Sequence, residues 1–248
     1  MPRRTKAWFI KIKMPQNEIH ILCTRTLEPF LITRAAEKNI FIDAIPFIKT
    51  EPLAAGEIEK LVSDVKHEKK FAAFTSSIAV EAIAAQIDKN INWKIYCTGG
   101  ITKEAVKKYF GSNSIEGSAK NASMIADKII AEKKVKEIIF FCGDQRMNDL
   151  PQRLLNDGIT VKEIIVYNTI LKPQVIDKNY DGILFFSPSA VHSFFSENTI
   201  VGNVILFAIG NTTATTIKTY CINKILISEW PGAENLIALA IDYFENNR

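Results

Sequence analysis

The sequence predicts an α/β protein with two lobes, each a parallel sheet flanked by helices, joined by a two-stranded ladder. Three observations lead to this prediction. Apolar runs of four to six residues recur, and each precedes a small or polar turn and a segment of helical periodicity, which is typical of βα units. Part of the chain repeats at one fixed offset. Two extended segments rich in β-branched residues separate the repeated parts.

The repeat keeps its register through strand, turn and helix. The segment FTSSIAV, which contains Ser76, matches the segment FFSPSAV, which contains Ser187, 111 positions later. The same 111 positions separate Gly99 from Gly210. A match of this length without insertion indicates two lobes of one ancestral design, which we expect to face each other across a cleft.

The strands and helices follow from the apolar runs and from the residues that precede helical segments. The predicted strands are Ile19–Cys23, Phe71–Thr75, Lys94–Thr98, Asn113–Glu116, Glu137–Cys142, Gly182–Phe186, Val204–Ile209 and Lys224–Ile227. Three helices have clear starts, because Thr102, Asn121 and Thr213 each precede a helical segment and carry a side-chain oxygen suited to an N-cap.

Counting βα units assigns the segments to lobes. The middle of the chain has four units and the C-terminal part has three, so we expect the N-terminal strand and helix to supply the missing unit. The predicted division is an N-terminal arm (1–18), a discontinuous lobe 1 (19–40 and 173–248), an inserted lobe 2 (51–160) and connecting strands (41–50 and 161–172). Two connecting strands side by side would form a ladder and a natural hinge.

Composition narrows the classes of protein. The 248 residues are 47% hydrophobic and 23% charged, with no apolar run near the roughly 20 residues that span a bilayer. A net charge of +4 suits an acidic small molecule better than nucleic acid. The cysteines lack CxxC spacing, and Cys23, Cys97 and Cys142 lie in apolar strands, which predicts buried thiols in a reducing, cytoplasmic compartment. The histidines have no metal-ligand spacing, so we expect no metal site.

Small residues follow the predicted strands at the edge where parallel α/β sheets bind ligands. Each of these loops opens a helix, whose free amides and positive dipole end favour an anion. The loops are Thr75-Ser76-Ser77, Thr98-Gly99-Gly100, Cys142-Gly143-Asp144, Ser187-Pro188-Ser189 and Ile209-Gly210-Asn211. Any one of them is explained as a helix cap or a tight turn. Their repetition on two lobes predicts a ligand with several negative groups.

Other motifs of catalysis are absent from the sequence. There is no G-x-x-x-x-G-K-[ST] phosphate loop, no G-x-G-x-x-G after a strand and no G-x-S-x-G elbow. His192 lies on a predicted helix, where we interpret it as a surface or packing residue rather than a base.

The order and spacing of several short motifs resemble the uroporphyrinogen-III synthase family. The resemblance covers nearly the whole chain from Ile19 onward. Its marks are Thr24-Arg25, Phe74-Thr75-Ser76, Ala79-Val80, Gly99, Thr102, Cys142-Gly143, Leu150, Leu154-Leu155, Val166-Tyr167-Asn168-Thr169, Phe186-Ser187-Pro188-Ser189-Ala190-Val191 and Ile209-Gly210-Asn211-Thr212-Thr213-Ala214. The resemblance implies two flavodoxin-like lobes joined by a two-stranded ladder, in agreement with the unit count.

The resemblance also implies a reaction of heme biosynthesis. A lyase of this family converts the linear tetrapyrrole hydroxymethylbilane into cyclic uroporphyrinogen III, with loss of water and inversion of the last ring. No cofactor and no partner beyond this substrate are implied, and nothing in the sequence requires more than a monomer. The substrate carries acetate and propionate groups on every ring, which suits several anion-binding loops.

Site residues follow from the resemblance and from the repeated loops. Tyr167 is the candidate to hydrogen-bond or protonate the leaving hydroxyl, and Thr213 is the second catalytic candidate. The substrate-binding candidates are Arg25, Ser76, Ser77, Gly99, Thr102, Gly143, Ser187, Ser189, Gly210 and Thr212. The chain departs from the family where Ser77-Ile78 replaces a common Pro-Arg and where Asn211 replaces a common proline.

Two alternatives remain open from the residues. A two-lobe receptor could bind an acidic tetrapyrrole or another polycarboxylate without turning it over, because a fold does not fix a function. A flavodoxin-like redox protein would carry a yellow flavin, although no aromatic-flanked flavin loop is present in the sequence.

Overall fold

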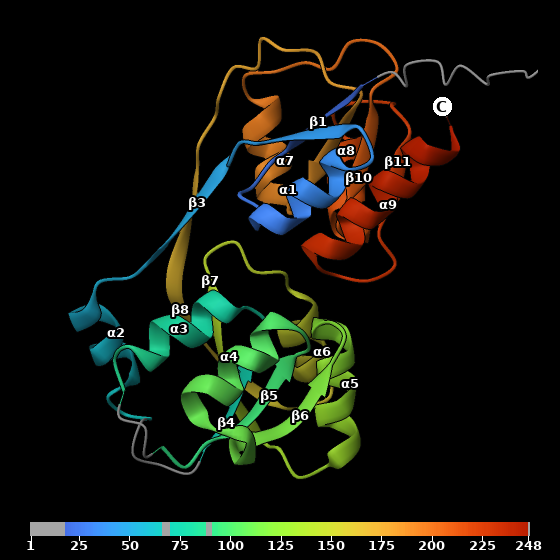
Figure 1. Cartoon of the computed structure of the whole chain (residues 1–248). Coiled ribbons are helices and arrows are strands. Elements are labelled where there is room, and N and C mark those ends of the chain that lie inside the picture. Colours follow the sequence, from blue (N-terminus) through green and yellow to red (C-terminus); the bar gives the residue numbers. More distant parts are fainter. Residues whose placement is uncertain (1–17, 66–69, 88–90, 248) are drawn as a thin grey trace, which may run out of the picture. The chain divides into compact units, whose positions relative to one another are not determined.

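The computed structural model describes residues 18–65, 70–87 and 91–247, so the predicted N-terminal arm lies outside the described residues except for Glu18. The chain forms two compact units. The first contains the described residues up to Pro46 together with Val175–Val191 and the chain from Asn198 onward. The second contains Phe47–Gln174 and His192–Glu197. We call them lobe 1 and lobe 2; Figure 1 colours lobe 1 blue and orange to red, and lobe 2 mainly green.

Lobe 1 is a parallel sheet with helices following its strands. Its five strands have the order β11-β10-β9-β1-β2. They are β1 (Ile19–Cys23), β2 (Ile40–Ala44), β9 (Gly182–Phe185), β10 (Ile205–Ala208) and β11 (Ile225–Ile227). The helices are α1 (Pro29–Ala36), α7 (Pro188–Phe195), α8 (Asn211–Lys218) and α9 (Ala233–Asn246), and the last residues of α7 belong to lobe 2.

Lobe 2 has a six-stranded sheet with the order β3-β8-β7-β4-β5-β6. Its strands are β3 (Ile48–Pro52), β4 (Phe71–Phe74), β5 (Lys94–Thr98), β6 (Ile115–Ala119), β7 (Glu137–Gly143) and β8 (Thr160–Leu171). Its helices are α2 (Ala55–Val62), α3 (Ser77–Ala84), α4 (Ile101–Phe110), the 3-10 turn η1 (Ser112–Ser114), α5 (Ala122–Glu132) and α6 (Asp149–Asn156). All neighbouring strands are parallel except β3 and β8, which are antiparallel.

The two lobes share one topology with different starting points in the chain. In lobe 2, β8-β7-β4-β5-β6 occupy the places that β2-β1-β9-β10-β11 occupy in lobe 1. Strand order therefore reverses between β1 and β9 in lobe 1 and between β7 and β4 in lobe 2. Such a switch point is where doubly wound sheets bind ligands, outside the carboxyl ends of the strands. The predicted fold class, two α/β lobes with parallel sheets flanked by helices, is confirmed.

Apolar strands are buried because helices cover both faces of each parallel sheet. On one face of the lobe 2 sheet, the rings of Phe74 and Trp93 stack on Phe141 with centroid distances of 5.1 and 5.2 Å. The other face buries Tyr96 and Phe140 against α5 and α6. In lobe 1, β1, β9 and β10 bury their apolar side chains against α1 and α9. These cores fix the carboxyl ends of the central strands.

The helix starts differ in part from the prediction. Asn121 is an N-cap as predicted, since its side-chain oxygen accepts a hydrogen bond of 3.0 Å from the Met124 amide. The predictions for Thr102 and Thr213 are wrong, because the N-caps of α4 and α8 are Gly100 and Gly210. Gly100 has a φ of 66°, a backbone conformation that favours glycine over threonine. The helices therefore begin earlier and bury both threonines in their first turns.

The strand predicted at Asn113–Glu116 is also displaced, because η1 occupies residues Ser112–Ser114 and β6 begins at Ile115. The two-stranded ladder is shorter than predicted, because only part of each connecting segment (41–50 and 161–172) takes part in it. Only Ile48–Pro52 pairs with Tyr167–Leu171, whereas the residues before each segment complete the parallel sheets through β2 and the first part of β8. Ile40 and Ile42 are buried in the core of lobe 1, which explains why the start of the first connecting segment forms β2 of that sheet and not the ladder.

All four cysteines are free, and Cys23, Cys97 and Cys142 are buried. Burial raises the pKa of these thiols to about 12, 11 and 12, respectively. The reactive thiolate is therefore scarce at neutral pH, as well as shielded. We expect a thiol reagent to modify the partly exposed Cys221 first in the native protein, and the other three only on unfolding. The stoichiometry of labelling with and without denaturant checks this, and rapid native labelling of Cys142 would contradict it.

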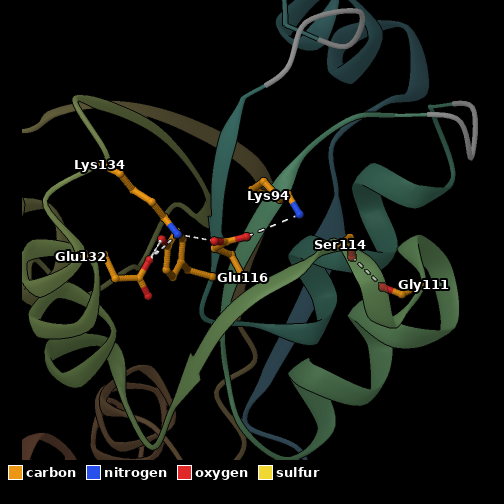
Figure 2. A network of polar contacts seen from close by, with 7 residues as sticks. Lys94, Gly111, Ser114, Glu116, Glu132 and Lys134 are labelled. Atoms are coloured by element: carbon orange, nitrogen blue, oxygen red, sulfur yellow. Dashed lines mark hydrogen bonds and ion pairs between the residues drawn. The ribbon is translucent and has the colours of Figure 1, made fainter.

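A polar network crosses the surface of lobe 2 between β5, β6 and the end of α5 (Figure 2). The Glu116 carboxylate lies between Lys134 and Lys94, with the Lys94 nitrogen 3.6 Å away. Lys134 also contacts Glu132 at 2.8 Å, and Glu132 accepts a 2.5 Å hydrogen bond from the buried Tyr96 phenol. The network thus connects surface charges to a core side chain.

This network predicts a dependence of lobe 2 stability on pH. The hydrogen bond from Lys134 is the main cause that holds the pKa of Glu116 below its usual range. A lowered carboxyl pKa stabilises the folded state above the ordinary value of about 4.3, and this contribution is lost as pH falls through the folded pKa. We expect Glu116→Gln to lower the urea midpoint modestly at pH 7 but little at pH 3. Urea unfolding at both pH values checks this; an equal loss at both would contradict it.

Candidate active site

The predicted loops of lobe 2 meet at the carboxyl edge of its sheet, beside the switch point between β7 and β4. Ser76 follows β4, Gly99 follows β5 and Gly143 ends β7. Hydrogen bonds tie these loops together: the Thr98 hydroxyl donates to the Thr75 carbonyl at 3.3 Å. The Gly99 amide donates to the Ala119 carbonyl at 2.8 Å, so this amide already has a partner within the lobe.

Tyr167 lies against Gly143 because β8 has an irregular register at this point. Cys142 pairs with Ile165, but the next residue, Gly143, pairs with Tyr167. A bulge of this kind redirects a side chain. The Tyr167 ring then covers Gly143 so closely that an added Cβ would lie 2.4 Å from its Cε2 and Cζ atoms and 2.8 Å from its hydroxyl. Only a glycine leaves room for the ring in this position.

The Tyr167 phenol is half-buried, and burial is the main cause that raises its pKa above the ordinary tyrosine value. A hydrogen bond with the Ser76 side chain acts in the opposite direction, and the nearby Cys142 and Asp144 raise the pKa further. The phenol therefore stays protonated at neutral pH. A protonated phenol held at a switch point can donate a hydrogen bond or a proton to a bound oxygen.

Ser76 and Ser187 have the same local role in the two lobes. Ser76 is the N-cap of α3 and accepts a 3.2 Å hydrogen bond from the Ile78 amide. Ser187 precedes α7 and accepts a 3.1 Å hydrogen bond from the Ala190 amide. Ser77 and Ser189 follow in the first turns of these helices, and both are partly exposed. The capping explanation thus holds for both serines, while Ser76 has the additional contact with Tyr167.

At the start of α4, Thr102 is only 3% exposed and therefore belongs to the packed side of the helix. The first helical donor is the Glu104 amide, which bonds to the Gly100 carbonyl at 3.1 Å, so the preceding amides of this turn have no helical acceptor. Lys103 lies in the same turn, close enough for its charge to lower the pKa of Cys97 at the end of β5. The sequence reasoning missed Lys103, although a lysine three residues after Gly100 was a usable signal.

In lobe 1, Arg25 follows β1 at the switch point with β9. Its guanidinium lies over the Phe186 ring, 5.3 Å from the centroid, and its side chain is exposed. The preceding Thr24 is buried, and its hydroxyl donates to the Leu184 carbonyl at 2.8 Å, which fixes the backbone from which Arg25 projects. A cation held on an aromatic ring is ordered without being neutralised.

The remaining lobe 1 candidates lie at the start of α8. Gly210 is the N-cap, with an extended backbone, and Thr212 in the first turn is exposed. Thr213 is 3% exposed and packs inside the lobe, as Thr102 does in lobe 2. Its catalytic role and the binding roles of the other candidates remain predictions. Within lobe 2 the structure brings Tyr167, Ser76 and Gly143 together, and within lobe 1 it brings Arg25 beside the loop that contains Ser187.

The described part of the chain holds no group of three or more His, Cys, Asp or Glu residues arranged to bind a metal ion. In the same residues, every helix is too short or too polar to cross a membrane. The groups that the candidate site offers to a ligand are the phenol, hydroxyls, amides and cations already described.

The fold defines a two-lobe α/β protein in which both lobes have the strand order of flavodoxin-like sheets. In each lobe, loops that lead into helices lie at the switch point, where a ligand would bind. The chain belongs to the uroporphyrinogen-III synthase HemD family, which matches residues 33–238. It is 23% identical over 180 residues to the uroporphyrinogen-III synthase of Saccharomyces cerevisiae. That alignment covers 67% of this chain and 64% of the yeast protein, so it spans less than two thirds of that relative.

Two solved structures share the fold at low sequence identity. A mutant uroporphyrinogen III synthase from the extremely thermophilic bacterium Thermus thermophilus is similar with a TM-score of 0.60 and 14% identity, covering 93% of this chain and all of that chain (100%). The uroporphyrinogen-III synthetase of Helicobacter pylori 26695 is similar with a TM-score of 0.62 and 16% identity, covering 91% of this chain and 99% of that one. At these sequence identities, both similarities show that the fold is shared.

Proposed function

We propose that the protein is a uroporphyrinogen-III synthase, a carbon–oxygen lyase that cyclises hydroxymethylbilane to uroporphyrinogen III with loss of water and inversion of ring D. Membership of the family supports this proposal. The observation that carries it is the position of the Tyr167 phenol over Gly143 at the switch point of lobe 2, where burial raises the pKa of the phenol. No cofactor enters the proposal, because the electron-rich pyrroles of the substrate supply the nucleophile.

The hydrogen bonds around Tyr167 favour a donor role. Ser76 Oγ accepts from the Ile78 amide, so the hydroxyl proton of Ser76 is directed elsewhere. If that proton points to the Tyr167 oxygen, the phenol proton remains free for a ligand. In the proposed step, Tyr167 donates a proton to the departing hydroxyl as the carbon–oxygen bond breaks, so that water leaves and a cationic azafulvenium remains. The substituted carbon of ring D then attacks, and the bound conformation decides which carbon reacts. The proton released after ring closure restores the Tyr167 phenol.

The substrate is a polycarboxylate, and the chain offers cations and amides to bind it. Arg25 in lobe 1 can form two parallel hydrogen bonds with a carboxylate, and Lys103 adds a charge at the start of α4. The first-turn amides of the helices after Gly100 and Gly210 provide further donors. Ser77, Ser189 and Thr212 are hydroxyls that the same carboxylates would reach. Exclusion of water from the cationic intermediate would complete the role of the protein.

We further propose that the enzyme works as a monomer in the cytoplasm, with no nucleic-acid or membrane partner. The free cysteines support a reducing compartment. The modest net charge of +4 supports a small acidic ligand over nucleic acid.

The isomer ratio of the product tests the proposed function. Freshly made hydroxymethylbilane is incubated with the protein, and the uroporphyrinogens are oxidised and separated. The proposal requires the type III isomer. Type I alone, as in the uncatalysed reaction, rejects it. Tight binding of the tetrapyrrole without turnover would instead identify the two-lobe receptor.

A further inference from the structure

The loop that follows β7 contains an acidic residue, Asp144, in a place where a polycarboxylate site is expected. An uncompensated carboxylate there would repel the substrate, so Asp144 is a poor candidate for a binding group. The corresponding position after β1 in lobe 1 is Arg25, a cation. Because Arg25 and Asp144 occupy equivalent positions with opposite charges, binding of a carboxylate cannot explain Asp144, and its own contacts indicate another role.

Hydrogen bonds connect Asp144 to the backbone of Tyr167 and of Thr169, two residues further along β8. The Asp144 amide donates to the Tyr167 carbonyl at 3.1 Å, and the Asp144 carboxylate accepts from the Thr169 amide at 2.8 Å. In a continuing parallel strand, a backbone carbonyl would accept the second of these bonds. The side chain of Asp144 therefore extends the ladder by one residue past the end of β7, where the chain turns toward α6.

The hydrogen bond from Thr169 to the Asp144 side chain lies next to the irregular pairing between β7 and β8. The register shifts between Cys142 and Gly143, so Tyr167 depends on local contacts for its position over Gly143. An ion pair between Arg146 and Glu163 holds the other end of the same loop to β8. From these contacts we propose that Asp144 is a positioning residue for Tyr167: it holds the Tyr167 carbonyl and the backbone that follows it, so that the ring stays over Gly143.

Charge gives Asp144 a second effect that can be measured. Among the described residues, negative charge on Asp144 or on an ionised Cys142 raises the pKa of the phenol, and the buried Cys142 thiol is neutral at pH 7. An amide side chain at position 144 keeps an acceptor for the Thr169 amide but removes the charge. The two effects of Asp144 can therefore be separated with the substitutions Asp144→Ala, which removes both, and Asp144→Asn, which removes only the charge.

Amide hydrogen exchange tests the positioning directly and requires no substrate. We expect the Thr169 amide to be protected in the unmodified protein and in Asp144→Asn, and to exchange at least about tenfold faster in Asp144→Ala. The control is Asp157→Ala, a change at an exposed aspartate after α6, which should leave Thr169 exchange unchanged. Unchanged protection in Asp144→Ala would overturn the proposal.

The kinetic test rests on the proposed function. Asp144→Ala should lower kcat by at least about tenfold with a small change in KM, while Asp144→Asn should retain most of the rate at pH 7. In the Asn variant the alkaline limb of the pH profile should move to lower pH, because a negative charge near the phenol is lost. In a Tyr167→Phe background, Asp144→Ala should add little, whereas full additivity of the two losses would overturn the proposal.

The two proposals fail in different ways. If the unmodified protein forms no type III isomer, the proposed function is rejected, yet Thr169 exchange and spectrophotometric titration of the phenol still report on Asp144. If the isomer forms but Asp144→Ala keeps full activity, the positioning role is rejected alone.

Discussion

Replacing Tyr167 with phenylalanine is expected to lower turnover of hydroxymethylbilane by at least about tenfold, which corresponds to about 1.4 kcal/mol of transition-state stabilisation. The substitution keeps the ring that covers Gly143 and removes only the hydroxyl. Folding stability should therefore change little, and the loss should appear in kcat rather than in KM. Initial rates of type III isomer formation, measured beside urea unfolding of the same variant, check both parts.

The matched control is Tyr109→Phe, a tyrosine at the far end of α4 from the site. This variant should retain full activity. The rate of the unmodified enzyme should also stay level as pH rises through 8 and 9, because burial raises the pKa of Tyr167 above the ordinary value of about 10. An unchanged rate for Tyr167→Phe, or a rate that falls already near pH 8 in step with deprotonation of the phenol, would exclude the donor role.

Replacing Gly143 with alanine should cause the second large loss. The new methyl group would lie 2.4 Å from two ring carbons of Tyr167, so the ring has to move. Overpacking of this kind costs about 1–3 kcal/mol of stability. Displacement of a catalytic group by about 1 Å can lower the rate by about 100-fold. We therefore expect Gly143→Ala to reduce kcat at least as much as Tyr167→Phe while also lowering the urea midpoint.

Gly56→Ala is the control for this prediction. Gly56 lies in α2 of the same lobe, and an added Cβ there would have no atom within 4 Å. Alanine should stabilise that helix by up to about 1 kcal/mol without affecting turnover. The combination Gly143→Ala and Tyr167→Phe should be no slower than the slower single variant. A Gly143→Ala enzyme with normal kcat would show that close contact with this ring is unnecessary.

The topology could be predicted because the sequence contains a repeat with a fixed offset and an apolar run for each buried strand. The fixed offset between Ser76 and Ser187 relates β4 to β9, and the offset between Gly99 and Gly210 relates β5 to β10. The apolar runs marked each buried strand, since strands covered on both faces need continuous apolar residues. Family motifs then singled out Tyr167, which the structure places beside Ser76 and Gly143.

The parts that escaped prediction depend on backbone geometry, either local or between distant residues. A threonine is a good N-cap in isolation, but Gly100 takes a left-handed conformation and begins α4 before Thr102 is reached. The contact of Asp144 with Thr169 joins residues 25 positions apart through a side chain that replaces a backbone acceptor. The second feature does not follow from residue type or periodicity, because it depends on how β8 is placed beside β7.

The ladder between β3 and β8 has a consequence for the order in which the protein is made. The Lys172 amide donates to the Phe47 carbonyl at 2.8 Å, so the entry and exit of the inserted lobe are immediate neighbours. When residue 174 leaves the ribosome, every strand of lobe 2 has been synthesised, whereas β9, β10 and β11 of lobe 1 have not. The nascent chain can then form the whole sheet of lobe 2, and His192–Glu197 join it later, whereas β1 and β2 still lack the other strands of their sheet. Chains that end in this region would carry the sheet of lobe 2 attached to the incomplete, apolar start of lobe 1, the kind of species that chaperones and proteases recognise.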